Sequence, residues 1–182
     1  MSSLNLSMHN YVPGTDYGEV YRLFTADTTN EMIISKPDHN SMNIFQKWLD
    51  KKLEDEFNDF MIFRSEDNDF VGFAYSYDFQ PLNGHCVFTL AVKDKYQKLG
   101  MGGVVSIEFL KYLFSHYNLR KVYIHIYGNN DMSIRCAEGF GFELEGVMKE
   151  YKYSNGEYVD LKIYAITRDD FLNSRFVKIV SQ

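Results

Sequence analysis

Residues Leu90–Gly103 read LAVKDKYQKLGMGG, and this stretch decides the fold of the chain. It combines the end of an apolar strand, a glycine loop and the start of a helix near Gly102. A helix N-terminus offers unpaired backbone N–H groups and the positive end of the helix dipole. Glycines allow a phosphate to approach those N–H groups closely. The loop Gln97–Gly103 is therefore a candidate cradle for a pyrophosphate.

Two common phosphate-binding motifs do not fit this loop. A Walker A motif is excluded because no Lys-Ser/Thr pair follows Gly103. A dinucleotide fingerprint is excluded because Gly100-Met101-Gly102 is followed by Gly103-Val104-Val105. A structural alternative stays open, in which the glycines serve only the geometry of a tight turn. The loop by itself indicates a phosphate-bearing ligand without identifying it.

The hydrophobic pattern on both sides of the loop alternates between helical and extended periods, which is typical of a mixed α/β domain. Helices are predicted over Asp16–Ala26, Ser41–Phe57, Gly102–Tyr117 and Asn130–Glu138. Strands are predicted over Phe60–Arg64, Phe70–Tyr77, His85–Val92, Lys121–Tyr127, Phe142–Tyr153 and Tyr158–Thr167. Between the last two strands, Asn155-Gly156 predicts a type I′ hairpin turn. Residues after Arg168 fit either a final helix or a frayed end.

The size and charge of the chain narrow the classes of function. Its 182 residues suit one domain with a single sizeable core. The net charge of −6 argues against nucleic acid and against an anionic membrane as partners, and it is compatible with a cationic substrate. The alternative is that the charge merely keeps the protein soluble.

Cysteine usage and the absence of targeting signals predict a cytoplasmic protein. Cys86 and Cys136 show no framework spacing, which fits a reducing compartment, although a disulfide between them stays open at this level. Met1–Asn5 lacks the basic and apolar segments of a signal peptide, and no apolar run approaches the ~20 residues that span a bilayer. His85, His125 and the two cysteines lack metal-ligand spacing, so no metal site is expected.

Two blocks of the sequence resemble one family. Gln97-x-x-Gly100-x-Gly102, directly after an apolar strand, resembles motif A of the GNAT N-acetyltransferase superfamily. Asn130-x-x-Ser133, continued to Gly141-Phe142, resembles the second conserved helix of that family and the strand that follows it. A third block, from Glu145-Gly146 to Asp160, is similar to the subgroup that includes ribosomal-protein N-terminal acetyltransferases and spermidine acetyltransferases.

The resemblance implies the GNAT fold for the whole chain. This is an α/β (α+β) fold in which about four helices surround a mixed, mostly antiparallel sheet. It implies a V-shaped splay between the strand that ends near Val92 and the strand that starts near Lys121. It also implies one acetyltransferase domain over residues 1–182, with its core at about residues 8–170.

The resemblance further implies acetyl-CoA as cosubstrate and assigns the residues that bind it. The strand before the loop would give backbone hydrogen bonds to the pantetheine arm, through Leu90, Ala91 and Val92. The loop amides would hold the pyrophosphate, through Gln97, Lys98, Leu99, Gly100, Met101, Gly102 and Gly103. Asn130 matches the family's asparagine near the pantetheine, and Ser133 is the next polar position on the same helix face.

The implied reaction is acetyl transfer to a primary amine by direct attack in a ternary complex. The acceptor is a small molecule or a peptide: a protein N-terminus, a polyamine, an amino sugar or another small amine. A neutral amine attacks the thioester, and a backbone N–H near Ala91 or Val92 could stabilise the resulting oxyanion. Many family members place a tyrosine acid seven residues after the asparagine, but here that position is Ala137.

The residues that transfer protons are therefore not assigned by the resemblance. Glu150 is the first candidate for the base, and the leaving thiolate would be protonated by Ser133, by Cys136 or by water. Weaker candidates for the base are Tyr151, Glu108 and His125, and a relay of ordered water is a further alternative. The structural interpretation of Cys136 is a small core residue on an apolar helix face.

The acceptor side is expected to lie among the N-terminal helices, because motifs A and B account for the cofactor half. Aromatic residues there and on the tail strands are candidate lining residues: Tyr17, Tyr21, Trp48, Tyr151 and Tyr153. Two alternatives stay open, a non-catalytic module that binds or senses acyl-CoA, which Ala137 favours, and a donor other than acetyl-CoA. A homodimer is also compatible with the resemblance, since sheet-edge dimers are frequent in this family.

Overall fold

Seven strands and seven helical segments are present in this computed structural model, which describes residues 6–34, 36–37 and 41–174. The strands are β1 (Ser7–Asn10), β2 (Phe60–Arg64), β3 (Phe70–Gln80), β4 (His85–Val92), β5 (Lys121–Tyr127), β6 (Glu143–Ser154) and β7 (Glu157–Thr167). The helices are α1 (Pro13–Thr25), α2 (Asp27–Met32), α3 (Met42–Leu53), α4 (Asp94–Gln97), α5 (Met101–His116), α6 (Asp131–Gly139) and α7 (Arg168–Asn173).

The strands form one sheet in the order β1-β2-β3-β4-β5-β7-β6. The pairs β1–β2, β2–β3, β5–β7 and β6–β7 are antiparallel, and β4–β5 is parallel. The predicted mixed, mostly antiparallel sheet is therefore confirmed. The parallel pairing joins His85–Val87 to residues 121–123, and the predicted splay beyond these positions stays a prediction.

Two compact units divide the chain. Unit one comprises residues up to Tyr77 together with Thr89–Phe109, and unit two comprises Asp78–Phe88 together with residues from Leu110 onward. The glycine loop belongs to unit one, whereas α6 and the β6–β7 hairpin belong to unit two. The expected single domain over residues 1–182 stays a prediction.

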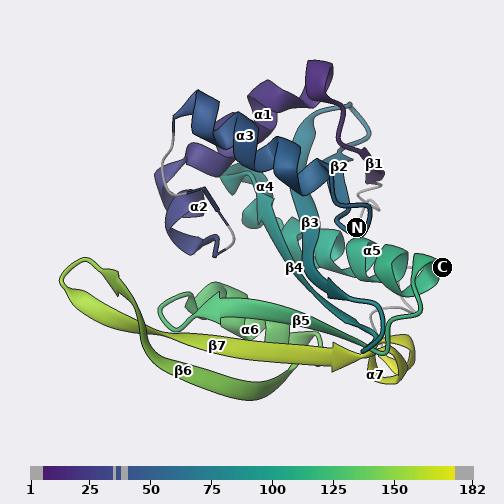
Figure 1. Cartoon of the computed structure of the whole chain (residues 1–182), viewed down its shortest axis with the longest axis vertical. Coiled ribbons are helices and arrows are strands. Elements are labelled where there is room, and N and C mark those ends of the chain that lie inside the picture. Colours follow the sequence, from purple (N-terminus) through teal and green to yellow (C-terminus); the bar gives the residue numbers. More distant parts are fainter. Residues whose placement is uncertain (1–5, 35, 38–40, 175–182) are drawn as a thin grey trace. The chain divides into compact units, whose positions relative to one another are not determined.

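Unit one is built on an aromatic core beneath two amphipathic helices (Figure 1). Helix α1 begins with Pro13, whose fixed φ suits the first helical turn, and α3 is capped by the Ser41 hydroxyl. Phe24 of α1 stacks on Phe73 of β3 at 5.8 Å, and Trp48 of α3 meets Tyr75 of β3 at 5.6 Å. Because Phe24, Phe73 and Tyr75 are large and buried, truncating one of them to alanine should cost about 3–5 kcal/mol.

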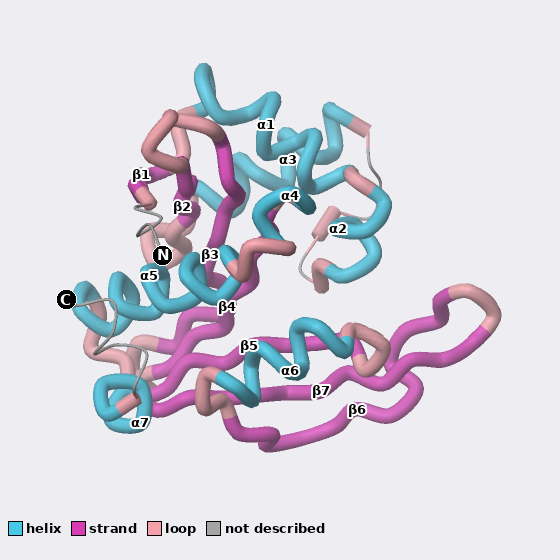
Figure 2. The backbone as a smooth tube through the Cα atoms, turned by 180° about the vertical axis from the view of Figure 1, so that it is seen from behind, coloured by secondary structure: helices cyan, strands magenta, loops and turns pink. Residues whose placement is uncertain are grey.

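In unit two, α6 lies along β5 and β7, and the β6–β7 hairpin extends past the sheet (Figures 1 and 2). Strand β7 pairs with β5 only from Leu161 to Thr167, so the outer part of the hairpin has β6 and β7 as its two strands. Its turn residues Asn155 and Gly156 have φ values of 52° and 90°. Two consecutive positive φ values are the signature of a type I′ turn, so the predicted turn is confirmed.

The differences from the sequence prediction lie in short elements. The predicted bounds of β2, β4 and β5 are confirmed. The short helices α2 and α4 and the short strand β1 add to the predicted elements, because segments of four to six residues show too little hydrophobic periodicity. Helix α7 is the final helix that was one of the two alternatives for the residues after Arg168. Helix α3 ends at Leu53, before the predicted Phe57. The segment read for a targeting signal, 1–5, lies outside the described residues.

Candidate active site

The glycine loop is a fixed turn between two helices. The Gly100 N–H donates to the Gln97 carbonyl at 2.9 Å, and the Gly103 N–H donates to the Gly100 carbonyl at 3.1 Å. Gly100 has a φ of 75°, a left-handed conformation that only glycine adopts without strain. This turn delivers the chain directly into α5, so the loop geometry that the sequence predicts is present.

Open space lies over the N-terminus of α5. A Cβ atom placed on Gly100 or Gly102 would meet no atom within 4 Å. The first turn of a helix carries N–H groups that have no acceptor within the helix, here beginning at Met101 and Gly102. These residues therefore fit a pyrophosphate. The N–H of Gly103, in contrast, is already bonded to Gly100.

Two sets of hydrogen bonds anchor the loop. The Gln97 side chain donates to the Val92 carbonyl at 2.6 Å, so this motif residue ties the loop to the end of β4. Asp69, from the β2–β3 turn, accepts from Lys95 at 2.9 Å and from the Tyr96 hydroxyl at 3.3 Å. The hydrogen bond from Lys95 lowers the pKa of Asp69 and raises that of Lys95. The sequence prediction missed Asp69, for which the Asp67-Asn68-Asp69 turn was the only signal.

The end of β4 offers its main chain rather than its side chains. Ala91 and Val92 are buried, and Leu90 is half-buried. Backbone groups are thus what this strand can present to a ligand, as the resemblance implies. Lys98 and Leu99 in the loop are exposed.

Helix α6 carries the second group of predicted residues, in unit two. Asn130 is its N-cap, and the Asn130 side-chain oxygen accepts from the Ser133 N–H at 3.2 Å. Ser133 is half-buried, and Ala137, in place of the expected tyrosine, is buried. The structural interpretation of Cys136 was wrong: its side chain is exposed, because it lies on the outer face of α6.

Glu150 lies at an irregularity in β6. The β6–β7 register shifts between Met148 and Lys152, and Glu150 there has a φ of 52°. Asp160 holds this conformation, accepting from the Glu150 N–H at 3.0 Å and from Lys149 at 2.8 Å. The hydrogen bond from Lys149 lowers the pKa of Asp160. The Glu150 side chain is exposed, so its carboxylate is accessible to a substrate.

His125 and Tyr164 of unit two also have shifted pKa values. Burial lowers the pKa of His125, and the charge of Asp78 opposes this effect. Burial, together with the hydrogen bond from its hydroxyl to Glu138 at 2.9 Å, raises the pKa of Tyr164 to about 12. Tyr164 contacts Glu138, the residue next to Ala137, and the hydroxyl proton of Tyr164 is engaged in this hydrogen bond.

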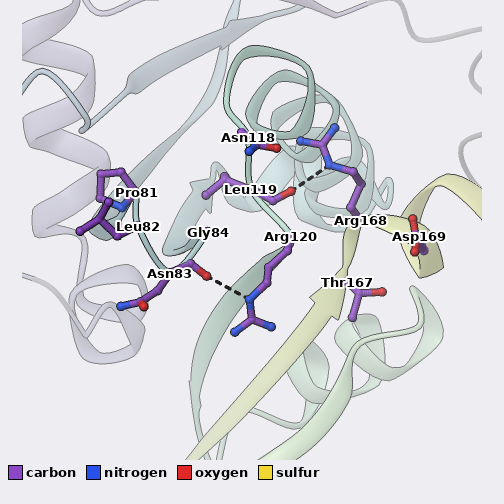
Figure 3. Close-up of a pocket in the computed structure, with 10 residues that line it drawn as sticks. All are labelled: Pro81, Leu82, Asn83, Gly84, Asn118, Leu119, Arg120, Thr167, Arg168 and Asp169. Carbon is purple, nitrogen blue, oxygen red and sulfur yellow. Dashed lines mark hydrogen bonds between the residues drawn. The ribbon is translucent and has the colours of Figure 1, made fainter.

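Two hollows lie outside the predicted site. One, of about 390 Å³ in unit two, is bordered by Arg120 and Arg168, which donate to the carbonyls of Asn83 and Leu119 (Figure 3). The other, of about 470 Å³ in unit one, contains Asp16, which is fully buried. Asp16 accepts from Arg64 at 2.9 Å and from the Val12 N–H at 2.8 Å. In both hollows the charged side chains named above form hydrogen bonds within the protein.

Within residues 6–34, 36–37 and 41–174, no three His, Cys, Asp or Glu side chains are grouped to hold a metal ion. Both cysteines are free thiols. No helix in the same part of the chain is long and apolar enough to cross a membrane.

A family model described as an acetyltransferase (GNAT) domain matches residues 13–163. The chain belongs to the GNAT acetyltransferase family. A prophage-derived N-acetyltransferase of Bacillus subtilis, YokL, is 31% identical over 132 residues, which cover 72% of this chain and 73% of that protein. The spermidine N(1)-acetyltransferase of Vibrio cholerae is 24% identical over 149 residues, covering 74% of this chain and 86% of that protein.

Solved structures confirm the GNAT fold. The spermidine N-acetyltransferase of Vibrio cholerae in complex with CoA and spermine matches with a TM-score of 0.84 at 20% identity. The match covers 92% of this chain and 98% of that one. This GNAT protein is thus an acetyl-CoA-dependent N-acetyltransferase that acts on a primary amine.

Proposed function

We propose that this enzyme acetylates a polyamine of the spermidine and spermine class. The match to the Vibrio cholerae spermidine N(1)-acetyltransferase supports this acceptor. A spermine/spermidine N(1)-acetyltransferase of Bacillus subtilis is also similar, with 29% identity over 102 residues. The net charge of −6 favours a polycationic substrate over a neutral one.

One observation in unit one carries the choice of acceptor. The ammonium group of Lys52 lies over three aromatic rings, 5.9 Å from the centroid of Trp48, 5.8 Å from Tyr75 and 4.9 Å from Tyr77. Aromatic faces attract ammonium groups through their quadrupole. The aromatic cluster beneath α1 and α3, where the acceptor is expected, thus already binds one ammonium group, that of Lys52, and this supports an acceptor that carries ammonium groups.

On the donor side, we assign the pyrophosphate of acetyl-CoA to the loop Gln97–Gly103. The open N–H groups at the start of α5 support this assignment, with Met101 and Gly102 as the central donors. In unit one, the pantetheine arm would pair with the main chain of Leu90, Ala91 and Val92. In unit two, Asn130 and Ser133 are proposed as cofactor-binding residues because they match the family's second conserved helix. The binding energy would then come mostly from backbone groups.

For the chemistry, Glu150 is the proposed general base. The amine nitrogen attacks the thioester carbon, the C–N bond forms and the C–S bond breaks. The amine proton passes to the Glu150 carboxylate, directly or through water, and the CoA thiolate takes a proton from Ser133, Cys136 or water. The exposure of the Glu150 and Cys136 side chains supports these roles, since both groups can meet a substrate.

We also propose that the enzyme is a homodimer joined along β6. This strand is the edge of the sheet, and exposed edges favour pairing with another chain. Six large apolar side chains on the hairpin are exposed: Leu144, Val147, Met148, Tyr151, Tyr153 and Tyr158. Light scattering should give a dimer mass, and Val147→Lys should give a monomer. A monomeric wild-type protein would contradict the proposal.

A cytoplasmic location completes the proposal, together with one functional domain over residues 1–182 and no nucleic-acid, membrane or metal partner. The free thiols of Cys86 and Cys136 support a reducing compartment.

An amine panel tests the proposed function. The purified protein is mixed with acetyl-CoA and, separately, with spermidine, spermine, glucosamine or an alanine-terminated peptide, and released CoA is measured. Spermidine and spermine should give kcat/KM values at least about tenfold above the others, since losing one hydrogen bond to a charged ammonium group costs roughly 1.5 kcal/mol or more. Preference for the peptide or the sugar would overturn the polyamine assignment. CoA binding without release on any amine would favour the acyl-CoA-binding alternative.

A further inference from the structure

Gly72 of β3 makes an unusually close approach to the end of β4. A Cβ atom on this residue would lie 2.1 Å from the Ala91 carbonyl oxygen and 2.9 Å from the Val92 Cα. No side chain tolerates such a distance to backbone atoms, so glycine is required here for space. Gly72 pairs with Phe63 on its other side, directly beside a register shift between Phe63 and Arg64 of β2.

The distances also give the direction of the Ala91 carbonyl. Its oxygen lies 2.1 Å from the missing Cβ position, and its carbon lies 3.1 Å away. Because a C=O bond is about 1.2 Å long, an oxygen that is closer than its carbon by about 1 Å shows that the carbonyl points toward that position. The Ala91 carbonyl is therefore turned into the space that Gly72 leaves by having no side chain.

This rotation sets the direction of one N–H group. In a planar trans peptide the N–H points opposite to the C=O. The Val92 N–H is thus directed away from Gly72.

The next peptide along the strand is held at both ends. The Val92 carbonyl accepts from the Gln97 side chain at 2.6 Å, and the Lys93 N–H donates to the Val71 carbonyl at 2.9 Å. Because the Val92–Lys93 peptide is fixed, the Ala91–Val92 peptide has little freedom to rotate back. Gly72 provides the space for this arrangement, and Gln97 provides the clamp.

We propose that Gly72 is a positioning residue for acetyl transfer, which directs the Val92 N–H to the thioester carbonyl oxygen by leaving room for the Ala91 carbonyl. The inference rests on the proposed function, in which the end of β4 binds the acyl arm. Gly72 touches neither substrate, and acts only through the rotation of this peptide.

The variant Gly72→Ala tests the inference. Its methyl group forces the Ala91 carbonyl away, so kcat should fall about 100-fold, the usual effect of losing one oxyanion donor. The Kd for CoA should change far less than kcat, by at most about threefold, because the loop Gln97–Gly103 still holds the pyrophosphate and only acetyl-CoA carries the oxygen that the Val92 N–H meets. Gly146→Ala is the matched control, since its Cβ would make an ordinary contact with Ile163 at 3.9 Å, and it should keep wild-type kcat. A kcat for Gly72→Ala within about threefold of wild type would overturn the inference.

A double variant covers the case in which Gly72→Ala does not fold. Gly72→Ala with Ala91→Gly should fold, because glycine at 91 lets the displaced carbonyl take another conformation, and it should bind CoA but stay slow. Ala91→Gly alone serves as its control. A double variant with wild-type kcat, or one that does not fold, would assign Gly72 to folding alone.

Amide NMR separates this inference from the proposed function. In the wild-type protein, the Val92 N–H resonance should shift more with acetyl-CoA than with CoA, and this difference should vanish in the folded variant. If the difference is absent in the wild-type protein, the Gly72 inference fails even where CoA is released normally. If no amine releases CoA, the proposed function fails, and the NMR difference still decides the role of Gly72.

Discussion

The glycine loop of unit one and the β6–β7 hairpin of unit two carry their candidate functions by different means. In the loop, the groups offered to a ligand are backbone N–H groups, fixed by the turn at Gly100 and by the Gln97 clamp on Val92. In the hairpin, the candidate group is the exposed side chain of Glu150, held only through its own backbone. Backbone sites follow from a sequence motif, whereas side-chain sites depend on the conformation of each strand.

The largest expected effect is at the loop. Gly102→Glu should abolish CoA binding and lower acetyl transfer at least about 1000-fold, because a carboxylate fills the open space and repels the pyrophosphate. Calorimetry with CoA measures the binding, and a thermal melt checks the fold. Gly139→Glu is the control, since it adds the same charge at a helical glycine with equally open surroundings. Unchanged CoA affinity in folded Gly102→Glu would reduce the loop to a structural turn.

The second effect is at the hairpin. Glu150→Gln should lower kcat about 100-fold with little change in the KM for acetyl-CoA, because a general base contributes about 10²–10⁴-fold. Glu157→Gln replaces another exposed glutamate of the same hairpin and should leave the rate unchanged. If the two variants have equal rates, Glu150 is not the general base, and water would accept the amine proton.

A smaller effect is expected for the clamp. Gln97→Ala removes the donor to the Val92 carbonyl and should lower kcat/KM about tenfold, the equivalent of one hydrogen bond of roughly 1.4 kcal/mol. Gln46→Ala, which removes an exposed side-chain hydrogen bond to Asp50, is the control. A Gln97→Ala enzyme as fast as the control would show that the backbone of the loop is sufficient by itself.

The smallest effect concerns stability in unit two. Because burial lowers the pKa of His125, the unfolded chain binds a proton more readily than the folded chain. Stability is therefore full above the ordinary histidine pKa of about 6.5 and declines as the pH falls below it. His125→Gln should flatten this decline in urea titrations. The control is His116→Gln, which replaces an exposed histidine. If His125→Gln changes the dependence of the unfolding free energy on pH no more than His116→Gln does, the assignment to His125 is contradicted.

The sequence predicted the backbone part of the molecule well. Strands β2, β4 and β5 and the Asn155-Gly156 turn follow from hydrophobic alternation and from turn chemistry, which are local properties. The strand–loop–helix order of motif A was equally local. The comparison with known proteins then confirmed the family that these motifs resemble.

Other features could not be read from the sequence, because they depend on contacts between distant residues. The residues around Gly72 do not show that the Ala91 carbonyl, nineteen positions later, lies against it. In the same way, the residues around Glu150 do not show that Asp160 fixes the backbone of Glu150. The exposure of Cys136 depends on which face of α6 packs against the sheet. The helical spacing of Ile134 and Ala137, both buried, was the signal that places Cys136 on the outer face.

The two cysteines differ in their access to thiol reagents. Cys86 is buried in β4, and Cys136 is exposed on α6, three residues after Ser133. A thiol reagent should therefore modify one cysteine per native chain, and an assay that detects released CoA by its thiol would carry that fixed background. The same selectivity makes Cys136 a natural attachment point for a fluorophore, one helical turn from the proposed pantetheine contact.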